Sequence, residues 1–310
     1  MIIVTGGAGM IGSNLIIKLN QLGLNDIHIV DNLHNGKKFS NISDLAISDY
    51  HDKNEFYIKL NNFKNVQVVF HLGACSDTTN WDGRYLLKNN YECSKILYNW
   101  CQENKTPMIY ASSASVYGKG DLGFQEKLSC EKPINLYAYS KFLFDQYVRI
   151  NENKRTAQVV GLRYFNVYGP REQHKGNMAS TIFHFNKQIL SNEEAKVFKG
   201  NGKIKNGEHK RDFVYVEDCA DLNFWFFKNP QISGIFNVGT GKAETFNEVA
   251  NSIISWHKRG KINYIEFPEN LLDAYQNYTQ ADLNSLKATN CPIKFRNIQN
   301  GIKDYLEWLN

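Results

Sequence analysis

The sequence predicts an α/β fold, a doubly wound parallel sheet joined to a smaller, interleaved C-terminal α/β lobe. The chain opens with a β-branched segment at residues 2–4, an apolar helical stripe from Ile11 to Leu22, and a second apolar segment at 27–31. Because strands that alternate with helices form parallel sheets covered on both faces, a continued alternation predicts the rest of the sheet. The further strand candidates are 66–70, 107–112 and 157–162, and the helical stretches between them are about 84–104 and 137–150.

The alternation becomes less regular after Tyr164, and this change predicts a second lobe. The segments 212–216 and 219–227 are expected to return to the sheet domain. The helical patterns on either side of them, at about 178–191, 246–257 and 300–309, are expected in the smaller lobe. We therefore expect a sheet domain at 1–165 plus about 212–240, and a lobe at about 166–211 plus 241–310.

Composition narrows the class of protein. The 310 residues carry a formal charge of +5, which suits an anionic small substrate such as a pyrophosphate and does not require nucleic acid. No apolar stretch reaches the roughly 20 residues that cross a bilayer, and the N-terminus does not resemble a signal peptide. The six cysteines form no Cys-x-x-Cys pair and the eight histidines show no zinc-type spacing. We expect a cytosolic enzyme with reduced thiols, without a metal and without a nucleic-acid or membrane partner.

A glycine-rich turn follows the first predicted strand. Gly6, Gly9 and Gly12 lie where a strand leads into an amphipathic helix, and small residues there let backbone amides approach a pyrophosphate. Asp31 ends the next strand, where a carboxylate accepts hydrogen bonds from the adenine-side ribose. These features predict a Rossmann-type dinucleotide site, with the small residues of the segment 71–76 approaching the adenine and ribose. Asp31 favours NAD because it repels a 2′-phosphate, but Lys37 and Lys38 follow closely and can offset that repulsion, so the residues leave both cofactors open.

A Tyr-x-x-x-Lys pair supplies the candidate catalytic groups. Tyr137 and Lys141 are neighbours on one helix face, and a nearby ammonium favours the phenolate that a tyrosine base requires. Ser113 ends the preceding strand and can hydrogen-bond the same substrate oxygen. A second copy, Tyr91 with Lys95, follows no serine-ended strand, and we interpret it as structural.

Together these motifs and the string Arg-Asp-Phe-Val-Tyr-Val at 211–216 resemble extended short-chain dehydrogenases that act on nucleotide sugars. Within that group the strings Gly-Ala-Cys-Ser at 73–76, Tyr-Phe-Asn-Val-Tyr-Gly-Pro-Arg-Glu at 164–172 and His-Lys-Gly-Asn-Met-Ala-Ser at 174–180 are similar to the ADP-L-glycero-D-manno-heptose 6-epimerase family. The resemblance runs from the first residue to Leu309. Leu72 departs from it, since a glutamate is common at that position, and the loop 202–210 is longer and more basic.

The resemblance implies an isomerase that oxidises C-6 of an ADP-heptose and returns hydride to the opposite face, with NADP as the usual cofactor and Lys38 at its 2′-phosphate. It implies Tyr137 and Lys175 as acid/base residues on opposite sides of the reacting carbon. It also implies a homopentamer whose product enters the lipopolysaccharide inner core in a Gram-negative cytoplasm. The cofactor contacts it implies are Gly6, Gly9, Met10, Ile11, Gly12, Asp31, Asn32, Lys38, Lys53, Leu72, Gly73, Ala74, Cys75, Ser76, Asn89, Lys141, Val167 and Lys175. The substrate contacts are Asn166, Asn177, His184, Phe198, Lys199, Gly200, Asn201, Arg211 and Tyr275.

The sequence motifs leave three alternative functions to consider. A nucleotide-sugar epimerase acting at C-4 would need no special lysine at position 175. A 4,6-dehydratase would place an Asp-Glu pair after the catalytic serine, where this chain has Ala114 and Ser115. A non-catalytic dinucleotide-binding regulator would typically lose the tyrosine and lysine, and this chain keeps both.

Overall fold

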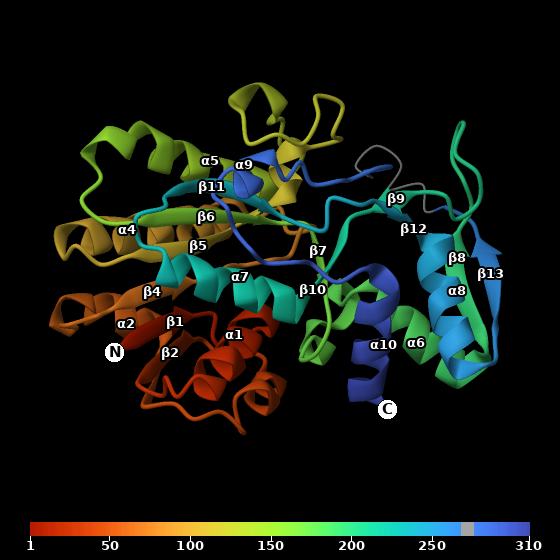
Figure 1. Cartoon of the computed structure of the whole chain (residues 1–310), viewed down its shortest axis with the longest axis horizontal. Coiled ribbons are helices and arrows are strands. Elements are labelled where there is room, and N and C mark those ends of the chain that lie inside the picture. Colours follow the sequence, from red (N-terminus) through yellow and green to blue (C-terminus); the bar gives the residue numbers. More distant parts are fainter. Residues whose placement is uncertain (268–275) are drawn as a thin grey trace.

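The computed structural model describes residues 1–267 and 276–310 and is built on a seven-stranded sheet (Figure 1). The strand order is β11-β6-β5-β4-β1-β2-β3, and every neighbouring pair is parallel. The parallel sheet predicted from the sequence is therefore confirmed. Its strands are β1 (Ile2–Thr5), β2 (Ile27–Asp31), β3 (Asp49–Asp52), β4 (Val68–His71), β5 (Met108–Ser113), β6 (Val159–Tyr164) and β11 (Gly234–Val238).

Helices cover both faces of this sheet because successive strand residues point to opposite sides. Ile2 and Val4 of β1 belong to the same core as α1 and α7, whereas Ile3 between them belongs to the core formed with α2, α4 and α5. Figure 1 shows α1 and α7 on one side of the sheet and α4 and α5 on the other. The helices of these layers are α1 (Met10–Gln21), α7 (Val216–Lys228), α2 (Lys53–Ile58), α3 (Gly83–Leu87), α4 (Cys93–Glu103) and α5 (Leu136–Ile150), with a π-helical turn at Lys88–Glu92 between α3 and α4.

A smaller lobe, at the right of Figure 1, has its own apolar core. Three helices pack there: α6 (Thr181–Asn192), α8 (Phe246–His257) and α10 (Ile298–Leu309). Two short sheets accompany them, the parallel pair β8 (Glu194–Phe198) with β13 (Lys261–Ile265) and the antiparallel pair β9 (Lys210–Arg211) with β12 (Glu244–Thr245). The chain leaves this lobe to form α7 and β11 and then returns to it, so the lobe is interleaved, as predicted.

Two features were not anticipated from the sequence. The segment 212–216, expected in the sheet domain, forms β10 (Phe213–Tyr215), which contributes Val214 to the sheet-domain core but pairs with β7 (Asn166–Tyr168) outside the seven-stranded sheet. The segment 219–227, also expected there, lies in α7, which packs on α1, and β11 follows at the sheet edge. Strand β3 was not predicted, because an edge strand of sequence Asp-Tyr-His-Asp carries no apolar pattern.

Among the described residues, the short helix α9 (Asn284–Lys287) packs on the sheet domain through Leu286. No helix in ranges 1–267 and 276–310 is long and apolar enough to cross a membrane. The predicted division of the chain at 165, 211 and 240 stays a prediction about folding units.

Candidate active site

A cavity of about 630 Å³ lies at the carboxyl ends of the central strands. That edge is where parallel α/β sheets bind ligands, because the strand-to-helix loops gather there. The catalytic candidates Ser113, Tyr137, Lys141 and Lys175 all line the cavity, and so does Asn166. All predicted cofactor contacts line it as well: Gly6, Gly9, Met10, Ile11, Gly12, Asp31, Asn32, Lys38, Lys53, Leu72, Gly73, Ala74, Cys75, Ser76, Asn89 and Val167.

The glycine turn leaves room for an anion at the start of α1. A Cβ atom on Gly12 would lie 2.3 Å from the Gly6 carbonyl oxygen, and one on Gly6 would lie 2.6 Å from the Gly73 nitrogen. Gly6 also has a φ of +68°, which favours glycine. Gly9 caps α1 without a side chain, so the first amides of the helix are open to a ligand. The turn therefore fits the pyrophosphate of a dinucleotide.

Asp31 braces this turn from the end of β2. Its carboxylate accepts hydrogen bonds from the backbone amides of Ala8 at 3.1 Å and Asn32 at 2.8 Å, and it is ion-paired with Lys38. The Asp31 carboxylate is nearly buried, and among the described residues the ion pair that it forms is with the Lys38 ammonium. Pairing with Lys38 reduces the repulsion that Asp31 would exert on a phosphate beside it.

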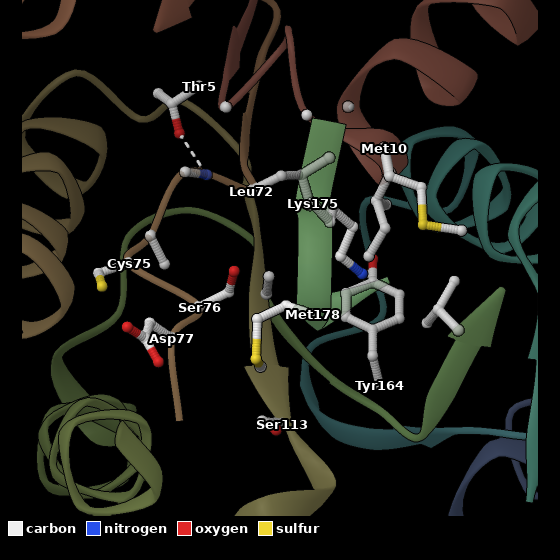
Figure 2. A pocket seen from close by; sticks show the side chains of 18 of the residues that line it. Thr5, Met10, Leu72, Cys75, Ser76, Asp77, Ser113, Tyr164, Lys175 and Met178 are labelled. Carbon is white, nitrogen blue, oxygen red and sulfur yellow. Dashed lines mark hydrogen bonds between the residues drawn. The ribbon is translucent and has the colours of Figure 1, made fainter. Parts of the chain in front are cut away.

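The side chains of Thr5 and Asn90 hold the loop after β4 in place through hydrogen bonds. Thr5 accepts a hydrogen bond from the Gly73 amide at 3.1 Å (Figure 2). The Thr5 hydroxyl also contacts the buried ring of His71 at 2.7 Å. Burial lowers the pKa of His71 to about 3, so the ring is neutral. Asn90, in the π-helical turn, bonds both the amide and the carbonyl of Cys75, at 2.8 and 2.9 Å, and donates to Ser140 of α5 at 3.0 Å. Asn90 thus joins the cofactor loop to the helix that carries Tyr137.

Tyr137 and Lys141 occupy successive turns of α5 and face the end of β5. Asn135 is the N-cap of this helix, and its side chain accepts a hydrogen bond from the amide of Ala138. The Lys141 ammonium donates to the Ala111 carbonyl of β5 at 2.8 Å. Burial lowers the pKa of Lys141 to about 8, and nearby Asp145 opposes that shift. Lys141 therefore keeps its proton at neutral pH but lies close to the range in which it loses it.

Ser113 completes this group from the end of β5. Burial raises the pKa of Tyr137, while a hydrogen bond with Ser113 acts in the opposite direction. In the protein alone the phenol is therefore protonated at neutral pH and can donate to an oxygen. The second copy of the motif lies away from the cavity, since neither Tyr91 nor Lys95 lines it. There Lys95 forms an ion pair with Glu92 at 3.1 Å and lies over the Tyr91 ring.

Lys175 reaches the cavity from the segment Gln173–Met178. Figure 2 shows its ammonium extending into the space between the loop after β4 and Tyr164. The buried carboxylate of Glu172 holds this segment by accepting from the Ser180 hydroxyl at 2.6 Å and from the Ser180 amide. Burial lowers the pKa of Lys175, and Glu172 opposes that shift. A lysine that looks like a surface residue in the sequence is therefore held inside the cavity, with a proton that is more easily released than usual.

The remaining substrate candidates that lie within the described ranges do not line the cavity. Arg211 is buried in β9 and lies over the Phe246 ring, with 5.8 Å between the guanidinium carbon and the ring centroid. The Asn201 side chain contacts His209 at 3.1 Å, and a Cβ on Gly200 would collide with the Ile204 carbonyl. These residues belong to the smaller lobe, and the others that lie off the cavity are Asn177, His184, Phe198 and Lys199. Tyr275 lies outside the described residues.

The cavity also includes residues that the sequence did not single out. Asp77 and Tyr85 line it from the segment after β4, and Met178 and Thr181 line it from the segment after Lys175. Figure 2 shows Asp77 and Met178. Asp77 and Tyr85 flank Thr-Asn-Trp-Asp-Gly at 79–83, a further string that resembles the heptose 6-epimerase family, and Met178 lies within the string at 174–180. That proximity was the one signal that could have identified them.

A glycine turn at a helix N-terminus, combined with a serine, a tyrosine and a lysine at the ends of β5 and α5, defines a dinucleotide-dependent enzyme of the short-chain dehydrogenase class. The model of the NAD dependent epimerase/dehydratase family matches residues 2–239, so the chain belongs to this family.

Similar proteins point to nucleotide sugars. The chain is 51% identical over 310 residues to a protein of Alkalilimnicola ehrlichii named ADP-L-glycero-D-manno-heptose-6-epimerase, covering 99% of this chain and 97% of that protein. The Helicobacter pylori structure of an enzyme with the same name superposes with a TM-score of 0.85 at 29% identity, over 99% of this chain and 95% of that one. A Thermus thermophilus UDP-glucose 4-epimerase in complex with NAD gives a TM-score of 0.80 at 25% identity, over 99% and 97% of the two chains.

Proposed function

We propose that this protein converts ADP-D-glycero-D-manno-heptose to ADP-L-glycero-D-manno-heptose by inverting C-6. The observation that carries the proposal is that one cavity contains two proton-handling groups from separate elements, Tyr137 on α5 and Lys175 on the segment Gln173–Met178. The similarity to heptose 6-epimerases supports the sugar and the position. An epimerase that acts at C-4 would not need the lysine at position 175, so that function is less favoured.

Two proton-handling groups suit this inversion for a chemical reason. The hydrogen on C-6 is not acidic, so the centre cannot be inverted by removing a proton, but it can be inverted through a ketone. A nicotinamide, when bound, would supply the hydride acceptance and return. One of the pair Tyr137 and Lys175, in its deprotonated form, takes the proton of the C-6 hydroxyl when C-6 is oxidised, and the other gives a proton to the same oxygen when C-6 is reduced on the opposite face. Ser113 hydrogen-bonds that oxygen, and Lys141, one turn from Tyr137, would hold the nicotinamide ribose.

We propose NADP as the cofactor, with NAD as the alternative. The support is the Asp31–Lys38 ion pair, which offers a cation beside the expected position of the 2′-phosphate. Lys53, which bonds Asn89 at the same cavity, adds a second cation. The glycine turn fits either dinucleotide, and a structural relative holds NAD.

The ADP end of the substrate is assigned to the smaller lobe. Arg211 offers a forked, permanently charged head for a pyrophosphate, and Phe198, whose ring contacts that of Phe267, is an aromatic candidate in the same lobe. Lys199, Gly200 and Asn201 follow Phe198 directly. We further propose that the enzyme acts as a homopentamer in the cytoplasm and that its product serves lipopolysaccharide core assembly.

The test is a reaction with no added cofactor. Purified protein is incubated with ADP-D-glycero-D-manno-heptose, and the configuration at C-6 is followed by proton NMR, with Tyr137→Phe as the inactive control. Formation of the L-glycero epimer supports substrate, position and a self-contained hydride cycle. If no epimer forms even with NADP or NAD supplied, the heptose proposal fails, and UDP- and GDP-sugars are then tested for inversion at C-4.

A further inference from the structure

Two histidines and an aspartate meet on one face of the sheet edge, on strands β2 and β3. The parallel register pairs His28 with Asp49 and Val30 with His51, so all three polar side chains project to the same side. His28 Nδ1 lies 2.9 Å from His51 Nε2, and His51 Nε2 lies 3.5 Å from an Asp49 carboxylate oxygen. One ligand atom from each of the three residues lies within 4.8 Å of the other two.

The two imidazoles are held in place by aromatic neighbours. Their planes are only 8° from parallel and their centroids are 5.2 Å apart, so with the 2.9 Å contact between nitrogens the two rings lie nearly in one plane and meet edge to edge. Phe63 contacts both rings edge-on, at centroid distances of 6.1 Å from His28 and 5.2 Å from His51. Both histidines are only partly buried, while the Asp49 side chain is 57% exposed. The donors are therefore ordered on one side and open to solvent on the other.

We propose that His28, Asp49 and His51 bind a divalent transition-metal ion such as Zn²⁺, at a site separate from the cavity. Two imidazole nitrogens and one carboxylate oxygen form a ligand set that suits zinc, whereas Mg²⁺ and Ca²⁺ prefer oxygen ligands alone. Zinc bonds of about 2.0–2.2 Å in a tetrahedron keep neighbouring ligand atoms roughly 3.3 Å apart. The separations of 2.9 and 3.5 Å lie on either side of that value, so the ligand atoms are close enough, and binding requires the two rings to turn until both lone pairs face the ion. A water molecule completes the fourth position.

Metal binding competes with the hydrogen bond that the two rings share. In that bond one nitrogen must carry a proton, and a metal needs lone pairs on both. When His28 is the donor, its proton moves to Nε2, which lies 3.8 Å from the Asp26 carboxylate, so the ring stays neutral and no net proton is lost. A carboxylate next to the far nitrogen of a ligating histidine is the usual partner that orients such a ring.

The ion would tie the edge strand of the sheet to its neighbour. Three residues after His28, β2 ends at Asp31, and two residues after His51 the chain reaches Lys53; both of these line the cavity. The metal site therefore lies behind the cofactor side of the cavity and would stiffen it. This inference does not depend on the proposed function, since it concerns residues outside the reaction.

The test uses the full-length protein after treatment with EDTA. Titration with Co²⁺ followed by visible absorption reports a tetrahedral nitrogen–oxygen site, and calorimetry with Zn²⁺ gives stoichiometry and affinity. We expect one ion per chain and a rise in melting temperature with Zn²⁺ but not with Mg²⁺. His51→Gln and the exposed-site variant Asp49→Asn should each weaken binding about 10-fold or more. The control His34→Gln changes an exposed histidine outside the cluster and should bind like the wild type.

Each result decides the proposal. Asp49→Asn alters an exposed side chain and keeps its shape, so a loss of affinity in that variant cannot be ascribed to misfolding. Absence of bound ion in the wild type, or equal affinity in the wild type and both variants, overturns the site and leaves the two rings as a hydrogen-bonded pair.

Discussion

Replacing Lys141 with methionine should stabilise the protein while it abolishes turnover. The Lys141 ammonium is buried, and burial lowers its pKa from 10.5 to about 8. That lowering corresponds to about 3 kcal/mol of folding free energy at neutral pH, because each pKa unit is worth about 1.4 kcal/mol. Methionine has a similar length and no charge, but it leaves the Ala111 carbonyl without its donor at a cost of about 1 kcal/mol. The net gain for Lys141→Met is about 2 kcal/mol at pH 7.

The gain should depend on pH in a defined direction. Below about pH 8 the folded protein keeps the Lys141 proton despite burial, and the unfolded chain keeps it up to about pH 10.5. Between these values the unfolded state binds more protons, so the stability contributed by Lys141 rises with pH by up to about 1.4 kcal/mol per unit. The advantage of Lys141→Met should therefore disappear near pH 9.5.

Urea unfolding of the cofactor-free protein at pH 7, 8 and 9.5 measures this difference, and the NMR assay measures turnover, which should fall at least about 100-fold. Lys95→Met is the matched control, since Lys95 occupies the second Tyr-x-x-x-Lys copy, where it makes only a partly exposed ion pair with Glu92 and cation–π contacts with Tyr91 and Tyr147 among the described residues. Its effect should stay below about 1 kcal/mol and should not recover between pH 8 and 9.5. A variant at Lys141 that is less stable than the wild type at pH 7, or a difference that does not vary with pH, would refute the reasoning.

Three further predictions concern buried groups around the cavity. Asp145 accepts four hydrogen bonds, two of them from the fully buried Arg163. Asp145→Asn should therefore lower the free energy of unfolding in urea by about 3–5 kcal/mol, and a decrease under about 1 kcal/mol would contradict this. Glu172→Gln weakens the clasp on the Lys175 segment, so turnover should fall about 10- to 100-fold while NADPH affinity, measured by fluorescence, stays unchanged. Gly12→Ala places a methyl group 2.3 Å from the Gly6 carbonyl, so the same titration should show NADPH affinity lowered at least about 10-fold; unchanged affinity would contradict the assigned turn.

The sheet and its covering helices could be predicted because their signals are local. The β-branched start of the chain, the apolar stripe of α1 and the 246–257 pattern each reflect burial of one face, and the structure has β1, α1 and α8 at these places. Strand β3 gave no such signal, since it lies at the edge and is polar. The pairs β8–β13 and β9–β12 were also missed, because each strand is short and its partner is far along the chain.

The same difference between local and distant signals applies to the sites. Gly6, Asp31, Tyr137 and Lys141 could be identified because each belongs to a motif whose neighbours in sequence are also neighbours in space. The meeting of His28 and His51 could not be anticipated, because the histidines show no zinc-type spacing in the sequence. The sequence therefore predicted no metal site. Only the register between two parallel strands, 23 residues apart in sequence, brings those rings together.

The bridge formed by Asn90 has a consequence for how this architecture accommodates different sugars. Because the buried amide side chain of Asn90 holds both the loop after β4 and helix α5, that loop and the helix that carries Tyr137 form a single mechanical unit. Such a unit resists adjustment to the shape of a new substrate, so adjustment falls to the smaller lobe, which packs around its own separate core. Related enzymes named for inversion at C-4 and at C-6 share this overall fold along almost the whole chain. A substrate of different shape should therefore be accommodated by changes in the smaller lobe, with the Asn90 unit left unchanged.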